Sequence, residues 1–106
     1  MMQAVEQKHE VNAEGNPAGG RSWGLGIEVQ WQDGPLSVDG VRRTPNGAFT
    51  EGVIQVAIGR LEFYQSSKFA CRENALAITK LQEALHWLQH RTMDREARGV
   101  EGTHKQ

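Results

Sequence analysis

Residues 27–32 alternate strictly between apolar and polar side chains in the sequence IEVQWQ. A period of two predicts a strand that buries one of its faces. The strand ends at an Asp-Gly-Pro sequence, after which residues 36–38 and 41–44 predict two further short strands joined by the turn signal Asp39-Gly40. The sequence therefore predicts a small antiparallel sheet within residues 23–47.

From residue 48 the apolar spacing changes to the three-to-four residues of an amphipathic helix. The first helix is expected to end near Ser66, and the second to run from about residue 71 to residue 98, a length of roughly 40 Å. The apolar face of the first helix comprises Val53, Ile54, Ala57, Ile58, Leu61 and Tyr64. Residues 48–98 are therefore predicted to form an antiparallel helical hairpin.

The second predicted helix carries apolar or small residues on more than one side. One row comprises Asn74, Ile78, Leu81, Leu85, Leu88 and Thr92. The opposite flank comprises Ala77, Lys80, Ala84, Trp87, Arg91, Arg95 and Arg98. A small sheet and one shorter helix cannot cover both sides, so we expect the hairpins to self-associate. The predicted fold class is α+β: a small N-terminal antiparallel β-sheet followed by a C-terminal two-helix antiparallel hairpin, in a homo-oligomer.

The two ends of the chain are polar and rich in glycine. Residues 1–22 contain Pro17 and three glycines, which predicts a flexible N-terminal arm. The sequence GNPAGG at residues 15–20 is either a backbone anion nest or part of that loose arm. Residues 99–106 predict a glycine-containing tail in which Gly99 ends the helix.

Composition narrows the class of protein. A chain of 106 residues has room for one small domain, and a net charge of -1 with both signs scattered argues against a DNA or RNA polymer as partner. A small anionic ligand needs only local positive charge. The single cysteine excludes an internal disulfide and indicates a reducing cytosol. No apolar run approaches about 18 residues, and no signal-peptide core is evident, which argues against membrane insertion and export.

Candidate catalytic and metal sites are weak. His86 and His90 have the i, i+4 spacing of metal ligands, but Glu83 lies outside the HExxH arrangement, so two exposed histidines are favoured. Cys71 lies at a predicted helix N-terminus without an obvious base, which favours a small buried residue. Neither a catalytic triad nor a phosphate-binding glycine loop is present. We therefore expect no catalytic residue, no metal and no cofactor.

Tyr64 and Asn74 are expected to lie at the same end of the hairpin. An aromatic ring can stack on a base, and an asparagine amide can read a base edge. Arg91 lies 17 residues beyond Asn74, roughly 25 Å along a helix, so only an antiparallel partner can bring an arginine to the same ligand. The alternative is a core tyrosine, a capping asparagine and solvated arginines, which the spacing alone favours slightly.

The end of the second helix and the tail also carry groups suited to phosphate. Arginines can bind phosphate oxygens bidentately, and a glycine next to a threonine offers backbone donors and a hydroxyl. The candidates are Arg95, Arg98, Gly102, Thr103 and His104. The alternative is a frayed C-terminus.

The sequence SKFACRENALAITKLQEALHWLQHRTMDREARGVEGTH resembles the helical hairpin of phage anti-defence sponge proteins. Its position after a short β-rich segment is more similar to the Thoeris anti-defence protein 1 family than to the all-helical anti-CBASS protein 2 family. The resemblance covers residues 47–104 and implies a phage-encoded protein of the host cytoplasm that is not an enzyme. Such proteins trap cyclic nucleotide immune signals, notably glycocyclic ADP-ribose, and some also take cyclic di- and trinucleotides.

The resemblance also implies roles for individual residues. The base-stacking aromatic falls on Tyr64, the pocket asparagine on Asn74, and the phosphate-binding arginine, supplied across a dimer, on Arg91. Arg21 and Trp31 are weak candidates, because the resemblance is poor in the strands. Three hairpin dimers are expected to form a hexamer, with room for a further anionic site on its axis.

Two other functions remain open. The hairpin could serve only for assembly in a phage structural or regulatory protein, or it could inhibit a host protein directly. A metal-dependent phosphodiesterase is a distant third possibility that rests on His86 and His90 alone.

Overall fold

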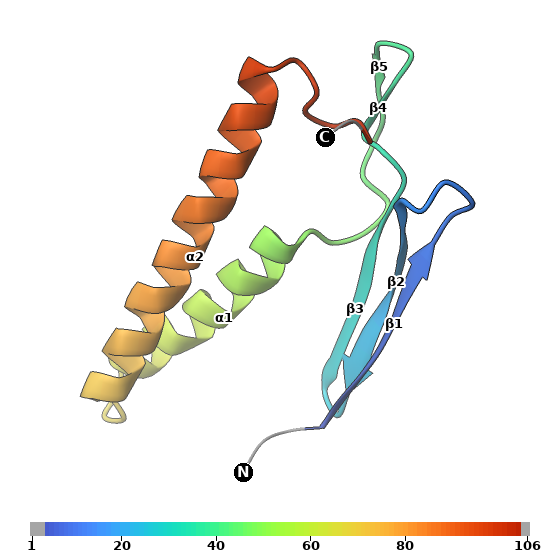
Figure 1. The fold of residues 1–106 in the computed structure, drawn as a ribbon. Helices are drawn as coiled ribbons and strands as arrows, with labels where there is room; N and C mark the ends of the chain where they lie inside the picture. Colours follow the sequence, from blue (N-terminus) through green and yellow to red (C-terminus); the bar gives the residue numbers. More distant parts are fainter. Residues whose placement is uncertain (1–3, 105–106) are drawn as a thin grey trace. The chain divides into compact units, whose positions relative to one another are not determined.

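The computed structural model describes residues 4–104, which form a β-rich part followed by two helices (Figure 1). The elements are β1 (Val5–Val11), β2 (Pro17–Gly24), β3 (Ile27–Asp33), β4 (Ser37–Val38), β5 (Val41–Arg42), α1 (Thr50–Gln65) and α2 (Arg72–Ala97). They divide into two compact units: residues 50–98 form one, and the residues before and after them form the other. The predicted fold class, a small antiparallel sheet followed by a helical hairpin, is confirmed.

The sheet is an antiparallel meander in the order β1-β2-β3. In its register Ser22 of β2 lies opposite Gln7 of β1 on one side and opposite Val29 of β3 on the other. The edge of β3 that does not pair with β2 is partly covered by the segment just before α1. There the Ala48 N–H donates to the Gln30 carbonyl at 2.7 Å, and Ala48 accepts from the Gln32 N–H at 3.0 Å.

The prediction of a flexible arm over residues 1–22 is wrong for most of that segment, because β1 and the greater part of β2 lie within it. All seven residues of β1 are exposed, so no apolar alternation marks the strand, and backbone pairing defines it. The glycines of this segment also indicated a flexible arm, although they lie in or beside strands. Gly20 has φ +128°, and a Cβ there would overlap the Lys8 carbonyl oxygen, so glycine allows the close approach of two strands. Residues 1–3 lie outside the described residues.

The loop between β1 and β2 is closed by a side chain. Asn12 Oδ1 accepts hydrogen bonds from the backbone N–H groups of Glu14 and Asn16, both at 3.0 Å, as an asparagine in a tight turn commonly does. The alternative that residues 15–20 form an anion nest is not supported by this arrangement, because Pro17 already begins β2.

The strands predicted at residues 36–38 and 41–44 form, but they are shorter and form a separate two-stranded sheet, β4-β5. The predicted turn between them is confirmed. Asp39 and Gly40 both have positive φ, 52° and 77°, as a type I′ hairpin turn requires. β3 therefore pairs with β2, and β2 with β1, rather than with the two short strands that were predicted as its neighbours.

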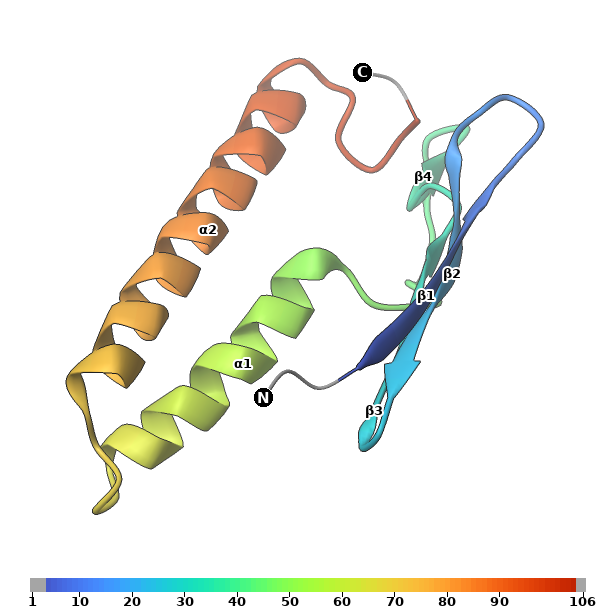
Figure 2. The same ribbon diagram turned by 60° about the horizontal axis from the view of Figure 1, so that its bottom comes forward.

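The helices begin and end within two residues of their predicted limits, and α1 and α2 form an antiparallel hairpin (Figure 2). Ile58 and Leu85, one from each predicted apolar face, are the apolar residues that this hairpin buries most fully, at 4% and 8% exposure. Ala57 was predicted in the same face but is exposed. The connector is closed by Gln65, whose side chain exchanges two hydrogen bonds with the Cys71 backbone at 2.9 and 3.0 Å.

Much apolar surface in the second unit remains uncovered. Exposed apolar side chains there are Val56, Phe63, Phe69, Leu76, Trp87 and Met93. Neither described helix is long and apolar enough to cross a membrane. Exposed apolar surface of this kind is typical of protein contact sites.

Candidate functional site

The connector end of the hairpin carries an aromatic ring and an amide. Tyr64 lies in the last turn of α1 and is half-buried, and Asn74 lies in the first turn of α2. The Asn74 amide donates only a long hydrogen bond, 3.5 Å, to the Phe69 carbonyl. A bond of this length is weak, so the amide group stays available to a ligand.

Arg60 is a candidate residue that the sequence analysis missed. Its guanidinium lies 4.9 Å from the centroid of the Tyr64 ring and 5.1 Å from that of Phe63. Its Nε also donates to the Tyr64 hydroxyl at 3.2 Å. The signal was present in the i, i+4 spacing of Arg60 and Tyr64 on a predicted helix. The arginine covers part of the ring on which a base would stack.

Arg91 lies in the last third of α2, far from this end. Its Nη2 is 4.0 Å from a Glu51 carboxylate oxygen, the outer limit of an ion pair. Because α2 is one continuous helix, Arg91 and Asn74 of the same chain are held roughly 25 Å apart. The structure therefore does not bring these two predicted site residues together within one chain.

Arg95 and Arg98 lie beyond Arg91, in the last turn of α2 and at its C-cap. The Arg98 Nε donates to the Asp94 carboxylate at 3.1 Å, one helical turn away, and Arg95 is half-buried. Gly99 follows with φ +73°, which confirms the predicted helix stop.

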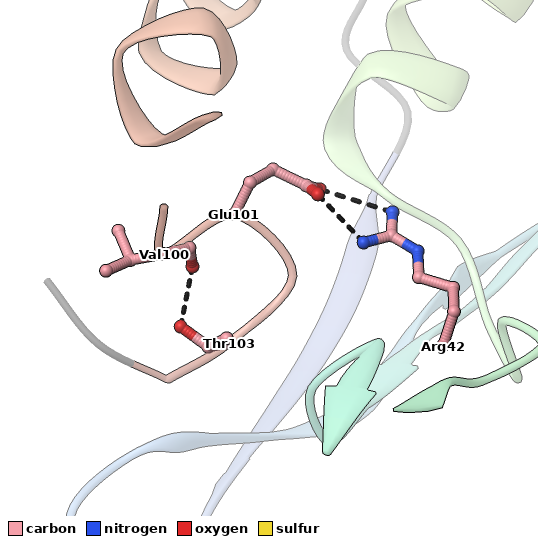
Figure 3. Close-up of polar contacts among 4 residues, drawn as sticks. All are labelled: Arg42, Val100, Glu101 and Thr103. Carbon is pink, nitrogen blue, oxygen red and sulfur yellow. Dashed lines mark hydrogen bonds and ion pairs between the residues drawn. The ribbon is translucent and has the colours of Figure 1, made fainter. Parts of the chain in front are cut away.

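The tail residues bind to the β4-β5 ribbon rather than fray (Figure 3). Arg42 forms an ion pair with Glu101 through two hydrogen bonds, 2.8 and 3.3 Å. Gly102 accepts a hydrogen bond from the Ser37 N–H at 2.8 Å, and the Thr103 hydroxyl donates to the Val100 carbonyl at 2.6 Å.

His104, at the end of the described tail, contacts the same unit. Its Nδ1 lies 3.2 Å from the Asn16 side-chain nitrogen in the β1-β2 loop. A hollow lies between the ribbon and the tail, lined by Ser37, Asp39, Gly40, Thr103 and His104. The tail groups predicted to approach phosphate are therefore partly engaged with their own unit.

The two weak candidates in the strands lie on opposite faces of the sheet. The Trp31 indole N–H donates to Ser22 Oγ at 2.8 Å, and Ser22 Oγ donates to the Gln7 side chain at 3.0 Å. On the other face, Arg21 lies over the Trp23 ring at 4.3 Å. Arg21 and Trp31 cannot contribute to a single site on one side of the sheet.

The metal and thiol candidates can also be placed. The rings of His86 and His90 both lie edge-on to Trp87, with centroids 6.0 and 5.9 Å away. No group of three or more potential metal ligands is found within residues 4–104. Cys71, expected to be buried, is exposed, and its backbone forms the hydrogen bonds with Gln65 that close the connector.

Comparison with known proteins adds the family. The family model described as Acb2/Tad1, hairpin domain, matches residues 25–93, a range that includes Tyr64, Asn74 and Arg91. A protein named Thoeris anti-defense 1 from Bacillus phage SBSphiJ7 is 53% identical over 77 residues, which are 73% of this chain and 51% of that protein. The chain thus spans about half the length of the curated relative that it matches. It belongs to the Acb2/Tad1 hairpin domain family.

Proposed function

We propose that this protein is a phage anti-defence protein that binds and sequesters cyclic nucleotide immune signals without degrading them. The similarity to Thoeris anti-defense 1 supports the anti-defence role. Glycocyclic ADP-ribose is the proposed ligand, with cyclic di- and trinucleotides as further ligands. The proposed setting is the host cytoplasm.

The observation that carries the proposal is the position of Asn74 and Arg91 at distant points of one unbroken helix, α2. A small cyclic nucleotide cannot span the roughly 25 Å between them. An antiparallel partner hairpin with its two-fold axis near Gln82 and Glu83 places the partner's Arg91 beside Asn74. Each pair of chains then forms two identical sites, as a two-fold interface requires.

The chemistry at each site follows from the available groups. The Tyr64 ring stacks on the base, as aromatic side chains do in single-strand nucleotide sites, and the Asn74 amide binds a base edge. Arg91 exchanges its long contact with Glu51 for a phosphate oxygen, a stronger charge-assisted pairing. Arg60, which covers part of the Tyr64 ring in the free protein, moves aside when the base stacks.

Further phosphate contacts are proposed for Arg95 and Arg98. The proposal does not depend on Gly102, Thr103 or His104, nor on Arg21 or Trp31, which remain predictions. A dissociation constant in the nanomolar range, near -12 kcal/mol, is sufficient for an abundant protein to hold its signal without chemistry.

The decisive experiment follows the fate of the ligand. Protein is incubated with glycocyclic ADP-ribose, separated from free ligand and denatured by heat, and the released material is analysed by mass spectrometry and for activation of the effector. Intact, active signal supports sequestration. A linearised or deglycosylated product identifies an enzyme, and absence of any retained ligand favours a hairpin used for assembly or for binding a host protein.

A further inference from the structure

The segment between β5 and α1 is held to the end of β3 by side-chain hydrogen bonds. Asn46 Oδ1 accepts from the Asp33 N–H at 2.8 Å, and Asn46 Nδ2 donates to the Asp33 carbonyl at 2.9 Å. The Asn46 amide thus pairs with both backbone groups of Asp33, much as a neighbouring strand would. In addition, the Gln32 side chain accepts from the Asn46 N–H at 2.8 Å. We refer to these contacts among Gln32, Asp33 and Asn46 as the Asn46 clamp.

The residue after Asn46 must be glycine for a separate reason. A Cβ on Gly47 would overlap the Trp31 carbonyl group and the Gln32 backbone nitrogen, so only glycine allows the segment to approach the edge of β3. The hydrogen bonds that pair Ala48 with β3 follow directly afterwards. The clamp therefore requires a side-chain amide at residue 46, and the close approach to β3 requires glycine at residue 47.

These two requirements together produce a chemically labile sequence. Asparagine is among the residues that proteins lose most readily to chemical change, and a following glycine has no side chain to obstruct attack by its own backbone nitrogen. In this reaction a bond forms from Gly47 N to Asn46 Cγ, the bond from Cγ to Nδ2 breaks, and ammonia leaves with the proton of the Gly47 N–H. Water then opens the five-membered imide at either carbonyl and gives aspartate or isoaspartate.

The surroundings of Asn46 favour this reaction over the same reaction at other asparagines. Asn46 is exposed, so water reaches it. The Gly47 N–H donates to no other group within residues 4–104, so no hydrogen bond holds the attacking nitrogen in place. While the clamp is closed, its hydrogen bonds restrict rotation of the amide, and the rate of reaction follows how often the clamp opens. The other asparagines precede alanine or proline: Asn12, Asn16 and Asn74.

We propose that Asn46 is a site of spontaneous deamidation and that the reaction opens the Asn46 clamp for good. A carboxylate has only acceptor atoms, so the product cannot donate to the Asp33 carbonyl as Asn46 Nδ2 does. It also places a negative charge beside that oxygen. The isoaspartate form adds a methylene to the backbone before Gly47, which shifts the pairing of Ala48 with β3. Deamidation therefore releases the segment just before α1 from the edge of β3.

Peptide mapping by mass spectrometry, on full-length protein stored at neutral and at mildly alkaline pH, measures the reaction. We expect conversion at Asn46 well before Asn12, an internal control whose amide oxygen also accepts two N–H groups but which precedes alanine. Gln32→Ala should convert about fivefold faster than wild type, as the loss of one hydrogen bond from the closed clamp implies. Gln30→Ala, at an exposed position of the same strand, should convert at the wild-type rate.

Hydrogen exchange of the product form tests the structural consequence, and neither measurement involves a ligand. In Asn46→Asp the backbone amides of Gln32 and Ala48 should exchange at least about tenfold faster than in wild type. Gln30→Glu makes the same change from amide to acid outside the clamp and should leave both rates unaltered. Conversion at Asn46 no faster than at Asn12, or wild-type conversion in Gln32→Ala, overturns the site or its control by the clamp. Wild-type exchange in Asn46→Asp overturns the release.

Discussion

The sheet and the hairpin are stabilised by different kinds of interaction. In the sheet, β1 exposes all of its side chains, and a chain of polar contacts from Trp31 through Ser22 to Gln7 links the three strands. The hairpin depends instead on apolar contacts around Ile58 and Leu85 and leaves other apolar side chains exposed. Both units leave apolar side chains exposed, but those of the hairpin include three aromatic side chains, Phe63, Phe69 and Trp87. Binding and assembly are therefore expected to concentrate on the hairpin.

The largest effect should come from the hairpin core. Leu85→Ala removes a side chain that is 8% exposed, and we expect it to lower the free energy of unfolding by about 2–5 kcal/mol, since truncation leaves a cavity. Urea denaturation followed by circular dichroism measures this loss. Leu76→Ala on the same helix, where the side chain is 46% exposed, should cost clearly less. Equal losses would contradict the assignment of the core.

Ligand binding should be the next most sensitive property. We expect Tyr64→Ala, Asn74→Ala and Arg91→Ala each to weaken binding of glycocyclic ADP-ribose by about 1–3 kcal/mol, because each removes a stacking or hydrogen-bonding group. Calorimetry measures the affinity, and Tyr64→Phe, which keeps the ring, should bind nearly as wild type. Wild-type affinity in all three alanine variants would place the pocket elsewhere.

Mixing two of these variants tests whether the site is shared between chains. An Asn74→Ala chain paired with an Arg91→Ala chain has one site with both groups intact and one site with neither. Subunit exchange should therefore recover tight binding in up to half of the sites of each mixed dimer. Failure of the mixture to bind better than either variant, after exchange has been verified, would count against a partner's arginine in the pocket.

In the sheet, Ser22→Ala should have a smaller effect than Leu85→Ala. The variant leaves the Trp31 indole N–H without its 2.8 Å acceptor, which should cost about 1–2 kcal/mol in stability. The change in Trp fluorescence on unfolding provides the measurement, and Thr44→Ala, which removes an exposed hydroxyl from the same unit, is the control. Unchanged stability in Ser22→Ala would mean that the polar contacts do not stabilise the sheet.

The smallest effect is expected at the tail. Arg42 and Glu101 have side chains that are 57% and 26% exposed, and pairs of this kind contribute about 0.2–1 kcal/mol. Arg42→Gln should therefore leave global stability nearly unchanged while speeding amide hydrogen exchange in residues 99–104. Arg43→Gln is the matched control. Exchange rates in the tail that do not change would show that other contacts hold it.

The hairpin was predictable because its apolar residues follow the period of a helix over two long segments. β1 and β2 were not, because a strand whose side chains are all exposed, such as Val5–Val11, has no apolar alternation and is defined by backbone pairing with distant residues. Glycines at 19 and 20 resembled a loop, although Gly20 serves the close approach of two strands.

Only part of the candidate site could be predicted from the sequence. Side-chain chemistry suggested Tyr64, Asn74 and Arg91, and helix geometry excluded that Arg91 lies beside Asn74 of the same chain. Arg60 was missed because its relation to the Tyr64 ring depends on the conformations of both side chains.

The unbroken course of α2 has a consequence for how the proposed capture depends on protein concentration. Since Asn74 and Arg91 are held apart in every chain, a site of the proposed kind exists only where two chains have met. Below the dissociation constant of the pair, the number of sites grows with the square of the protein concentration, and bound ligand in turn favours pairing. A doubling of expression then gives about four times the trapping capacity, so the proposed capture increases more steeply than the protein concentration.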